Sequence, residues 1–217
     1  MMQTSDLIEA LVADATPVRR LRPPAVRAAW WLLLAVLVLA LAALHHGLRP
    51  DLALKLRQPV FVSGVAAAAL TGVLAAIAAF IVSVPGRSQR WLLLPMPTLV
   101  VWFATIGYGC LTDWVRLGPG GISLGETASC FATLMLVGLP LSFALLIMLR
   151  HVARLYARPV AMCGSLAVAA LTAAALSLLH PLDATVMILL WNFGVALVFL
   201  GVTSRYGDRL FAWVAPH

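Results

Sequence analysis

Three cysteines carry the most reactive side chains in this sequence: Cys110, Cys130 and Cys163. No two of them form a C-x-x-C pair, so their spacing indicates neither a zinc ribbon nor a disulfide framework. Three interpretations are open. The cysteines pack as small apolar residues, two of them form a disulfide, or their thiolates bind a soft metal ion. The choice depends on the elements that position each thiol.

Those elements are predicted to be membrane helices. The chain of 217 residues is 63% hydrophobic and only 11% charged, with a mean hydropathy of +1.01, so it is far more apolar than a soluble globular domain. Apolar runs of membrane-spanning length lie at residues 28–48, 60–84, 91–111, 127–149, 160–179 and 184–204. We predict an all-α polytopic membrane protein. Its bundle of six transmembrane helices occupies residues 26–206, between an N-terminal segment (1–25) and a C-terminal tail (207–217), and Pro140 should kink the fourth helix.

The basic residues predict how this bundle is oriented. Starting from the N-terminus, alternate segments between the apolar runs hold 11 of the 15 Lys and Arg residues, and the other segments hold four. Because short loops rich in positive charge stay in the cytoplasm, both termini should be cytoplasmic. This orientation places Cys110 and Cys130 near the outer face of the membrane and Cys163 toward the cytoplasm.

Two kinds of chemistry fit the outer face. A disulfide needs Cα atoms within about 7 Å, so only Cys110 and Cys130 could form one, and the oxidising compartment permits it. His180 falls near the same rim, so Cys110, Cys130 and His180 could together bind a soft metal ion. Alternatively, His180 and Asp183 cap the turn into the last helix, and the cysteines only pack.

The predicted spans contain almost no ionisable residues. Charges inside a membrane mark proton relays, ion paths and voltage sensors, so their absence argues against a small transporter, a pump or a channel. The spans instead contain closely spaced Ala, Gly and Ser, as in SGVAAAALTG at residues 63–72, which allows helix backbones to pack closely.

A membrane thiol-disulfide oxidoreductase is a second alternative. Such an enzyme needs a reactive cysteine pair, often close in sequence, and a resolving partner, and the sequence shows neither.

The N-terminal stretch SDLIEALVADATPVRRLRPP has a different character. Asp6 and Glu9 are spaced as a capping box and Pro17 ends the pattern, which predicts a helix of about ten residues. Its apolar face consists of Leu7, Ile8, Leu11 and Val12. So short a helix is unstable alone in water, and its acidic polar face does not suit an anionic membrane surface. We therefore expect a cytoplasmic protein to bind the apolar face, while the arginines that follow meet lipid headgroups and require no nucleic acid.

Several stretches resemble the NrsF family of six-span membrane anti-sigma factors, which regulate extracytoplasmic-function sigma factors negatively. The resemblance lies in DLIEALVADATPVRRLRPP, LRPDL, AAFIVSVPGRS, SCFATLMLVGLPL, LRHVARLYARPVAMCGSLA and LHPLDATVMILLW. It implies a bacterial inner-membrane protein whose cytoplasmic N-terminal segment binds the sigma factor and releases it on a signal sensed by the membrane domain. The expected contact residues are Asp6, Leu7, Ile8, Leu11 and Val12.

The family's sensing chemistry is attributed to two cysteines, and this chain matches only the first of them, Cys130. The second position, in a pattern like HCPED, is HPLDA here, so His180 and Asp183 remain while the thiol is missing. The candidate signal-sensing residues are therefore Cys110, Cys130, His180 and Asp183. We expect a binding protein without catalytic residues, a bound metal or a cofactor.

Overall fold

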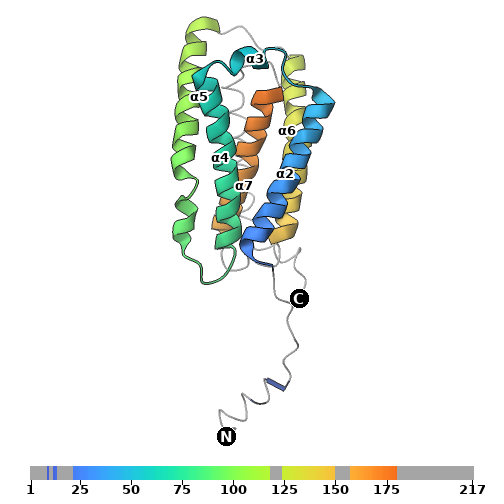
Figure 1. Ribbon diagram of the computed structural model, residues 1–217, viewed down its shortest axis with the longest axis vertical. Helices are drawn as coiled ribbons and strands as arrows, with labels where there is room; N and C mark the ends of the chain where they lie inside the picture. The colour runs from blue at the N-terminus through green and yellow to red at the C-terminus, as the bar shows by residue number, and fades with distance from the viewer. Residues whose placement is uncertain (1–8, 10–11, 14–21, 118–123, 150–156, 180–217) are drawn as a thin grey trace.

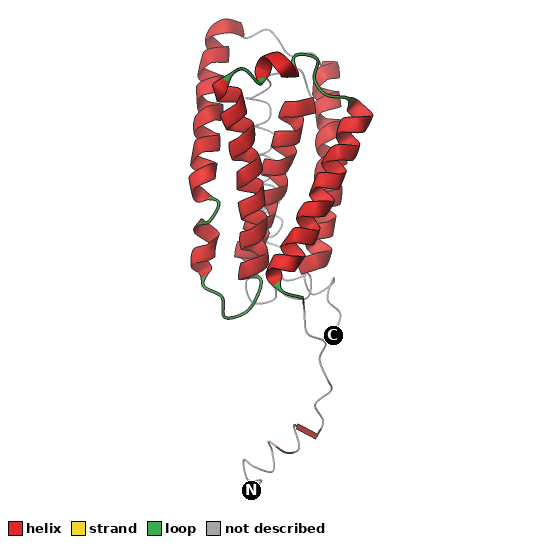
Figure 2. Cartoon of the chain, viewed as in Figure 1, coloured by secondary structure: helices red, strands yellow, loops and turns green. Residues whose placement is uncertain are grey.

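The computed structural model describes residues 9, 12–13, 22–117, 124–149 and 157–179, and the regular elements among them are all helices (Figure 2). The short helix α3 (Leu52–Lys55) connects α2 to α4, and a 3-10 helix η1 (Gln89–Leu93) precedes α5. Consecutive long helices run in opposite directions (Figure 1). The five long helices are α2 (Pro24–His46), α4 (Pro59–Val82), α5 (Met96–Leu117), α6 (Leu124–Leu149) and α7 (Ala157–Leu179).

The two ends of the bundle are distinguished by the N-terminal segment. We call the end where α2 begins and α4 and α6 finish the tail end, because the chain enters α2 there (Figure 1). The opposite end, where α2 and α7 finish, is the far end. The predicted orientation puts the tail end in the cytoplasm.

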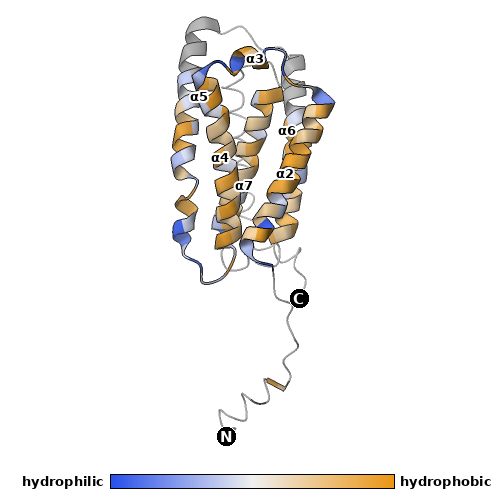
Figure 3. Cartoon of the chain, in the orientation of Figure 1, coloured by the Kyte–Doolittle hydropathy of each residue, from blue (hydrophilic) through white to orange (hydrophobic). Residues whose placement is uncertain are grey.

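Five of the described helical stretches are long and apolar enough to cross a membrane: Pro24–His46, Pro59–Val82, Gln89–Tyr108, Ala132–Leu149 and Arg158–Leu179. Figure 3 shows apolar residues along the helices and polar residues gathered at the two ends. The fold is therefore that of a helical membrane protein, and five of the six predicted spans are present. The sixth, at residues 184–204, lies outside the described residues.

Small residues bring α4 and α7 close together at the centre of the bundle. A Cβ atom added to Gly72 of α4 would lie 2.7 Å from Cγ of Leu171 and 3.1 Å from the carbonyl oxygen of Ala167, both on α7. Glycine at this position allows the two backbones to approach. The stretch SGVAAAALTG thus packs as its composition predicts. Helix α5 lies on one side of this central pair, and α2 and α6 lie on the other (Figure 1).

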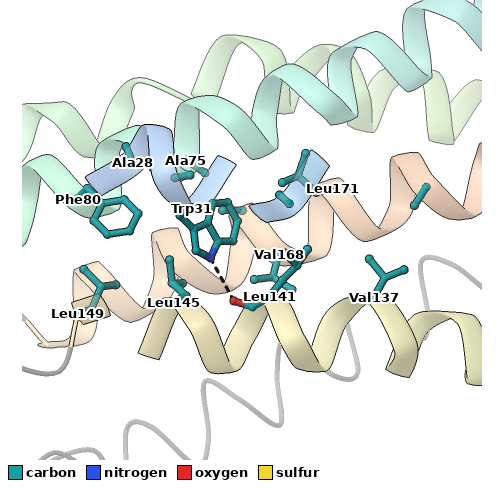
Figure 4. Close-up of a cluster of buried hydrophobic side chains, with 14 of the residues drawn as sticks. Ala28, Trp31, Ala75, Phe80, Val137, Leu141, Leu145, Leu149, Val168 and Leu171 are labelled. Atoms are coloured by element: carbon teal, nitrogen blue, oxygen red, sulfur yellow. Dashed lines mark hydrogen bonds between the residues drawn. The ribbon is translucent and has the colours of Figure 1, made fainter. Parts of the chain in front are cut away.

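A large apolar cluster joins α2 to α6, α7 and the tail end of α4. Trp31 of α2 is fully buried in this cluster, together with Phe80 of α4, Leu141 and Leu145 of α6, and Val168 of α7 (Figure 4). The opposite face of α2 exposes a row of large apolar side chains, as a surface in contact with lipid tails would: Trp30, Leu33, Leu37, Leu41 and Leu44. Helix α2 therefore has one face for packing and one for lipid.

Both ends of α2 have clear physical causes. Pro23 has an extended backbone (φ −51°, ψ 144°) and Pro24 is the first helical residue, a position where the missing N–H would be unpaired in any case. After His46, Gly47 adopts φ 76° and donates its N–H to the carbonyl of Ala43 at 2.9 Å. Glycine takes this left-handed conformation at little cost and so ends the helix.

Candidate functional site

The predicted partner-binding segment precedes α2. Within it, the structure describes Glu9, Val12 and Ala13, which are helical and exposed, and Val12 is 69% exposed. The amphipathic helix as a whole stays a prediction, because the other predicted contact residues lie outside the described residues: Asp6, Leu7, Ile8 and Leu11. Since the segment continues into α2, the contacts that hold α2 in place form the rest of the candidate site.

Arg27 attaches the beginning of α2 to the end of α6. It lies buried in the first turn of α2, and its guanidinium donates a hydrogen bond to the carbonyl oxygen of Met148. Met148 belongs to the last turn of α6, where carbonyl groups have no donor within their own helix. The guanidinium also lies 5.3 Å from the centre of the Phe80 ring on α4, within cation–π range. Its positive charge stands at the negative end of the α6 dipole.

Trp31 attaches α2 to α6 a second time, one helical turn further along. Its indole Nε1–H donates to the carbonyl oxygen of Leu141 at 3.2 Å (Figure 4). A buried tryptophan N–H normally needs such an acceptor. Leu141 follows Pro140, which lies inside α6. Because Arg27 and Trp31 are four residues apart, they lie on the same face of α2 and meet α6 at two different heights.

Arg49 attaches the other end of α2 to the end of α7. It is only 3% exposed, and its Nη1 donates to the carbonyl oxygen of Ser177 at 3.3 Å, while its backbone N–H donates to the carbonyl of Leu178 at 3.2 Å. Its guanidinium lies 5.6 Å from the centre of the Phe61 ring on α4. Ser177 and Leu178 belong to the last turn of α7. Arg49 therefore donates to the last turn of α7 at the far end, just as Arg27 donates to the last turn of α6 at the tail end.

Asp51 orients the Arg49 guanidinium. The Nε and Nη2 groups of Arg49 donate to the two carboxylate oxygens of Asp51 at 2.7 and 2.8 Å. The hydrogen bond from Arg49 is the main cause that lowers the pKa of Asp51 below its ordinary value. A two-point arginine–carboxylate contact fixes the plane of the guanidinium, which leaves Nη1 directed at α7.

The three cysteines lie on three different helices. Cys110 of α5 and Cys130 of α6 are both toward the far end, but α5 and α6 lie on opposite sides of the bundle (Figure 1). Their side chains are outside the described part, as are His180 and Asp183, so the disulfide and the metal site stay predictions. Cys163 is buried on α7 against Ala78 and Ala79 of α4. Among the residues described, no group of three or more His, Cys, Asp or Glu could hold a metal ion.

Comparison with known proteins adds the family. The sequence matches the NrsF family, described as negative regulator of sigma F, over residues 11–213. This chain belongs to the NrsF family. No curated protein and no solved structure matches it. The family description supplies the class of partner, a sigma factor, and it agrees with the resemblance found in the sequence.

In this NrsF-family protein, sequence reasoning misses the residues that secure α2. The sequence predicts Arg27 as an orienting charge at the membrane edge and gives Arg49 no role beyond the LRPDL stretch, yet both are buried. Their carbonyl acceptors lie 121 and 128 residues further along the chain. The Arg-x-Asp spacing of Arg49 and Asp51 is the one local signal, because it permits a short-range ion pair. Nothing in the local sequence separates Trp31 from Trp30.

Proposed function

We propose that this protein is a membrane-bound anti-sigma factor. Its N-terminal segment holds an extracytoplasmic-function sigma factor at the cytoplasmic face of a bacterial inner membrane, and a signal received by the membrane domain releases it. The observation that carries the proposal is the match to a family of negative regulators of sigma F over residues 11–213. Both termini are cytoplasmic in this proposal, as the distribution of basic residues predicts.

The N-terminal segment supports binding as the mode of action. Its predicted apolar face consists of Leu7, Ile8, Leu11 and Val12, and Val12 is exposed. Within the described part of the chain, every long element belongs to the membrane bundle, which supports a soluble protein as the partner that covers this face. A short helix that orders as it enters a groove on another protein fits this requirement. Binding alone suffices, without catalysis, a cofactor or direct contact with nucleic acid.

The proposal is tested by replacing Leu7, Ile8, Leu11 and Val12 with serine in the full-length chain. Two measurements are made: recovery of the sigma factor with the detergent-solubilised protein, and transcription from a promoter that this sigma factor serves. The variant should lose the sigma factor and raise transcription, because the serine side chains cannot fill an apolar groove. Ala10→Ser combined with Ala13→Ser is the matched control, since these residues lie on the other side of the predicted helix.

Retention of the sigma factor by the serine variant, with the promoter still silent, would refute the proposal. Deletion of residues 1–17 gives a second, coarser comparison. A regulator loses its partner on this deletion, whereas a thiol oxidoreductase or a transporter would keep its activity.

Signal reception is assigned to the far end in the same proposal, with Cys130 as the first candidate. Thiol labelling of intact cells, with and without diamide as the oxidant, tests whether Cys110 and Cys130 form a disulfide. If the two cysteines form a disulfide, both should lose their reactivity toward the thiol label when diamide is added. Independent changes in their labelling would exclude the disulfide. Substitution of His180 tests the metal alternative: loss of a response to added zinc, with the diamide response retained, would support it.

A further inference from the structure

The contacts made by α2 carry an inference that rests on the proposed function and concerns its regulation. We infer that α2 is the transmission element of the regulator. The hydrogen bonds from Trp31 to Leu141 and from Arg27 to Met148 keep α2 in the position in which the N-terminal segment holds the sigma factor. Arg27 and Trp31 are thus positioning residues, which act on the segment through α2 and do not touch the partner.

Two hydrogen bonds at different heights hold α2 against α6. A single hydrogen bond between two helices leaves a pivot, whereas two bonds at different heights also fix rotation and axial register. Arg27 and Trp31 are one turn apart on α2. Their acceptors, Met148 for Arg27 and Leu141 for Trp31, are two turns apart on one face of α6. Because α2 and α6 are antiparallel, the order of the two contacts along both helices agrees (Figure 1). The rotation of α2 about its axis is therefore set by α6.

These two contacts lie in a largely buried environment. Arg27, Trp31 and Leu141 are buried, so water cannot readily replace a lost partner of the guanidinium or the indole N–H. Intermediate positions of α2 would leave these donors unmatched. The helix is consequently held in a discrete position and moves only when a second set of contacts becomes available, which is the property a switch requires.

The helices that hold α2 also connect it to the far end of the bundle. Cys130 lies on α6, the helix that supplies both acceptors to α2. His180 follows directly after α7, whose last turn is bonded to Arg49, three residues beyond the end of α2. The two helices next to the candidate sensing residues are therefore attached to the α2 region, α6 through Arg27 and Trp31 and α7 through Arg49. Helix α5, which carries Cys110, packs against α4 instead.

The experiment uses the full-length protein in cells, without any added signal, and a promoter served by the sigma factor. Trp31→Phe keeps an aromatic ring in the core but removes the N–H donor and part of the buried indole volume, and the core variant Leu176→Ala described below controls for the lost volume. It should raise transcription on the order of tenfold, the usual size of a coupling between two sites. Trp30→Phe is the matched control, because Trp30 is exposed on the lipid-facing side of α2. It should leave transcription unchanged.

A second pair of variants tests the tail-end contact. Arg27→Gln should raise transcription as Trp31→Phe does, whereas Arg87→Gln should not. Arg87 is exposed in the loop between α4 and η1 at the tail end, so both changes remove one positive charge from the same side. Arg27→Lys, which keeps the charge and a donor, should restore part of the repression. If Trp31→Phe is not recovered in the membrane, the comparison of Arg27→Gln with Arg87→Gln tests the inference in its place.

General destabilisation is separated from loss of these contacts by a core variant elsewhere. Leu176→Ala opens a cavity between α6 and α7, in a cluster apart from α2, and membrane levels are compared by immunoblot. Equal derepression by Leu176→Ala and Trp31→Phe at equal levels would overturn the inference. So would wild-type repression by both Trp31→Phe and Arg27→Gln while deletion of residues 1–17 derepresses. If that deletion leaves the promoter silent, the proposed function itself is wrong.

Discussion

Trp30 and Trp31 are neighbours in the chain, yet Trp30 is 56% exposed while Trp31 is fully buried and donates its indole N–H to Leu141. The 100° step between successive helical residues separates them into a lipid-facing and a core-facing side chain. Because α2 has apolar residues on all sides, hydrophobicity alone does not show which face packs. The difference between Trp30 and Trp31 identifies the face of α2 that packs against the other helices.

Replacement of Arg49 should destabilise the bundle. Arg49→Ala removes the donor to Ser177, and Arg49→Lys cannot reproduce the two-point contact with Asp51. We expect Arg49→Ala to lower the free energy of unfolding by about 1–3 kcal/mol, because the α7 carbonyl and the carboxylate lose a buried donor. Chemical unfolding in detergent micelles measures this. Arg57→Ala removes an exposed charge from the same loop and should have little effect; an equal loss there would argue against the specific role of Arg49.

The ion pair between Arg49 and Asp51 should weaken in acid. Because the pKa of Asp51 is lower in the folded protein than its ordinary value of 3.8, its contribution is complete above that value and is lost as the pH falls through the lower folded pKa. Asp51→Asn should therefore lower the midpoint of thermal unfolding at pH 7, and the difference from wild type should shrink below about pH 4. A difference that stays constant down to pH 2 would contradict this assignment.

A side chain at Gly72 should separate α4 from α7. Gly72→Ala places Cβ 2.7 Å from Leu171 Cγ, and the overpacking should cost about 1–3 kcal/mol in the free energy of unfolding. Gly107→Ala in α5 is the control, since a Cβ atom there meets nothing within 4 Å and alanine should stabilise the helix by about 0.5–1 kcal/mol. Opposite signs are expected in the same unfolding assay. A neutral Gly72→Ala would show that α4 and α7 can separate freely.

The predicted orientation can be checked with single introduced cysteines at the two ends of the bundle. Gln58 at the far end and Ser88 at the tail end are both exposed. A membrane-impermeant maleimide added to intact cells should label Gln58→Cys, whereas Ser88→Cys should react only after the inner membrane is permeabilised. Labelling is measured above that of the three natural cysteines. The reverse pattern would place the N-terminal segment outside the cytoplasm and remove the basis for sigma-factor binding.

Hydrophobicity along the chain predicts the long helices well, but it predicts their ends less well. Helices α6 and α7 each begin three residues before the predicted apolar runs, at Leu124 and Ala157, because a helix continues through polar residues at the membrane edge. The third predicted span is not one continuous helix. It starts as η1, and α5 begins only after Pro95, whose lack of an N–H interrupts the ladder of hydrogen bonds.

The candidate site was less predictable because it depends on contacts between distant segments. A guanidinium that caps the end of another helix leaves no periodic signal, so Arg27 has the same local appearance as the exposed Arg22. The N-terminal segment is the opposite case. Its charge pattern, its proline and its four apolar residues are adjacent in sequence, so the sequence offers a binding role from spacing alone, and that role stays a prediction.

The pair Pro23–Pro24 joins the N-terminal segment to α2. Consecutive prolines resist bending, and the extended backbone of Pro23 leads straight into the first helical turn. A twist of α2 would therefore reorient the chain where it leaves the membrane, because the double proline offers no flexible hinge to absorb the twist.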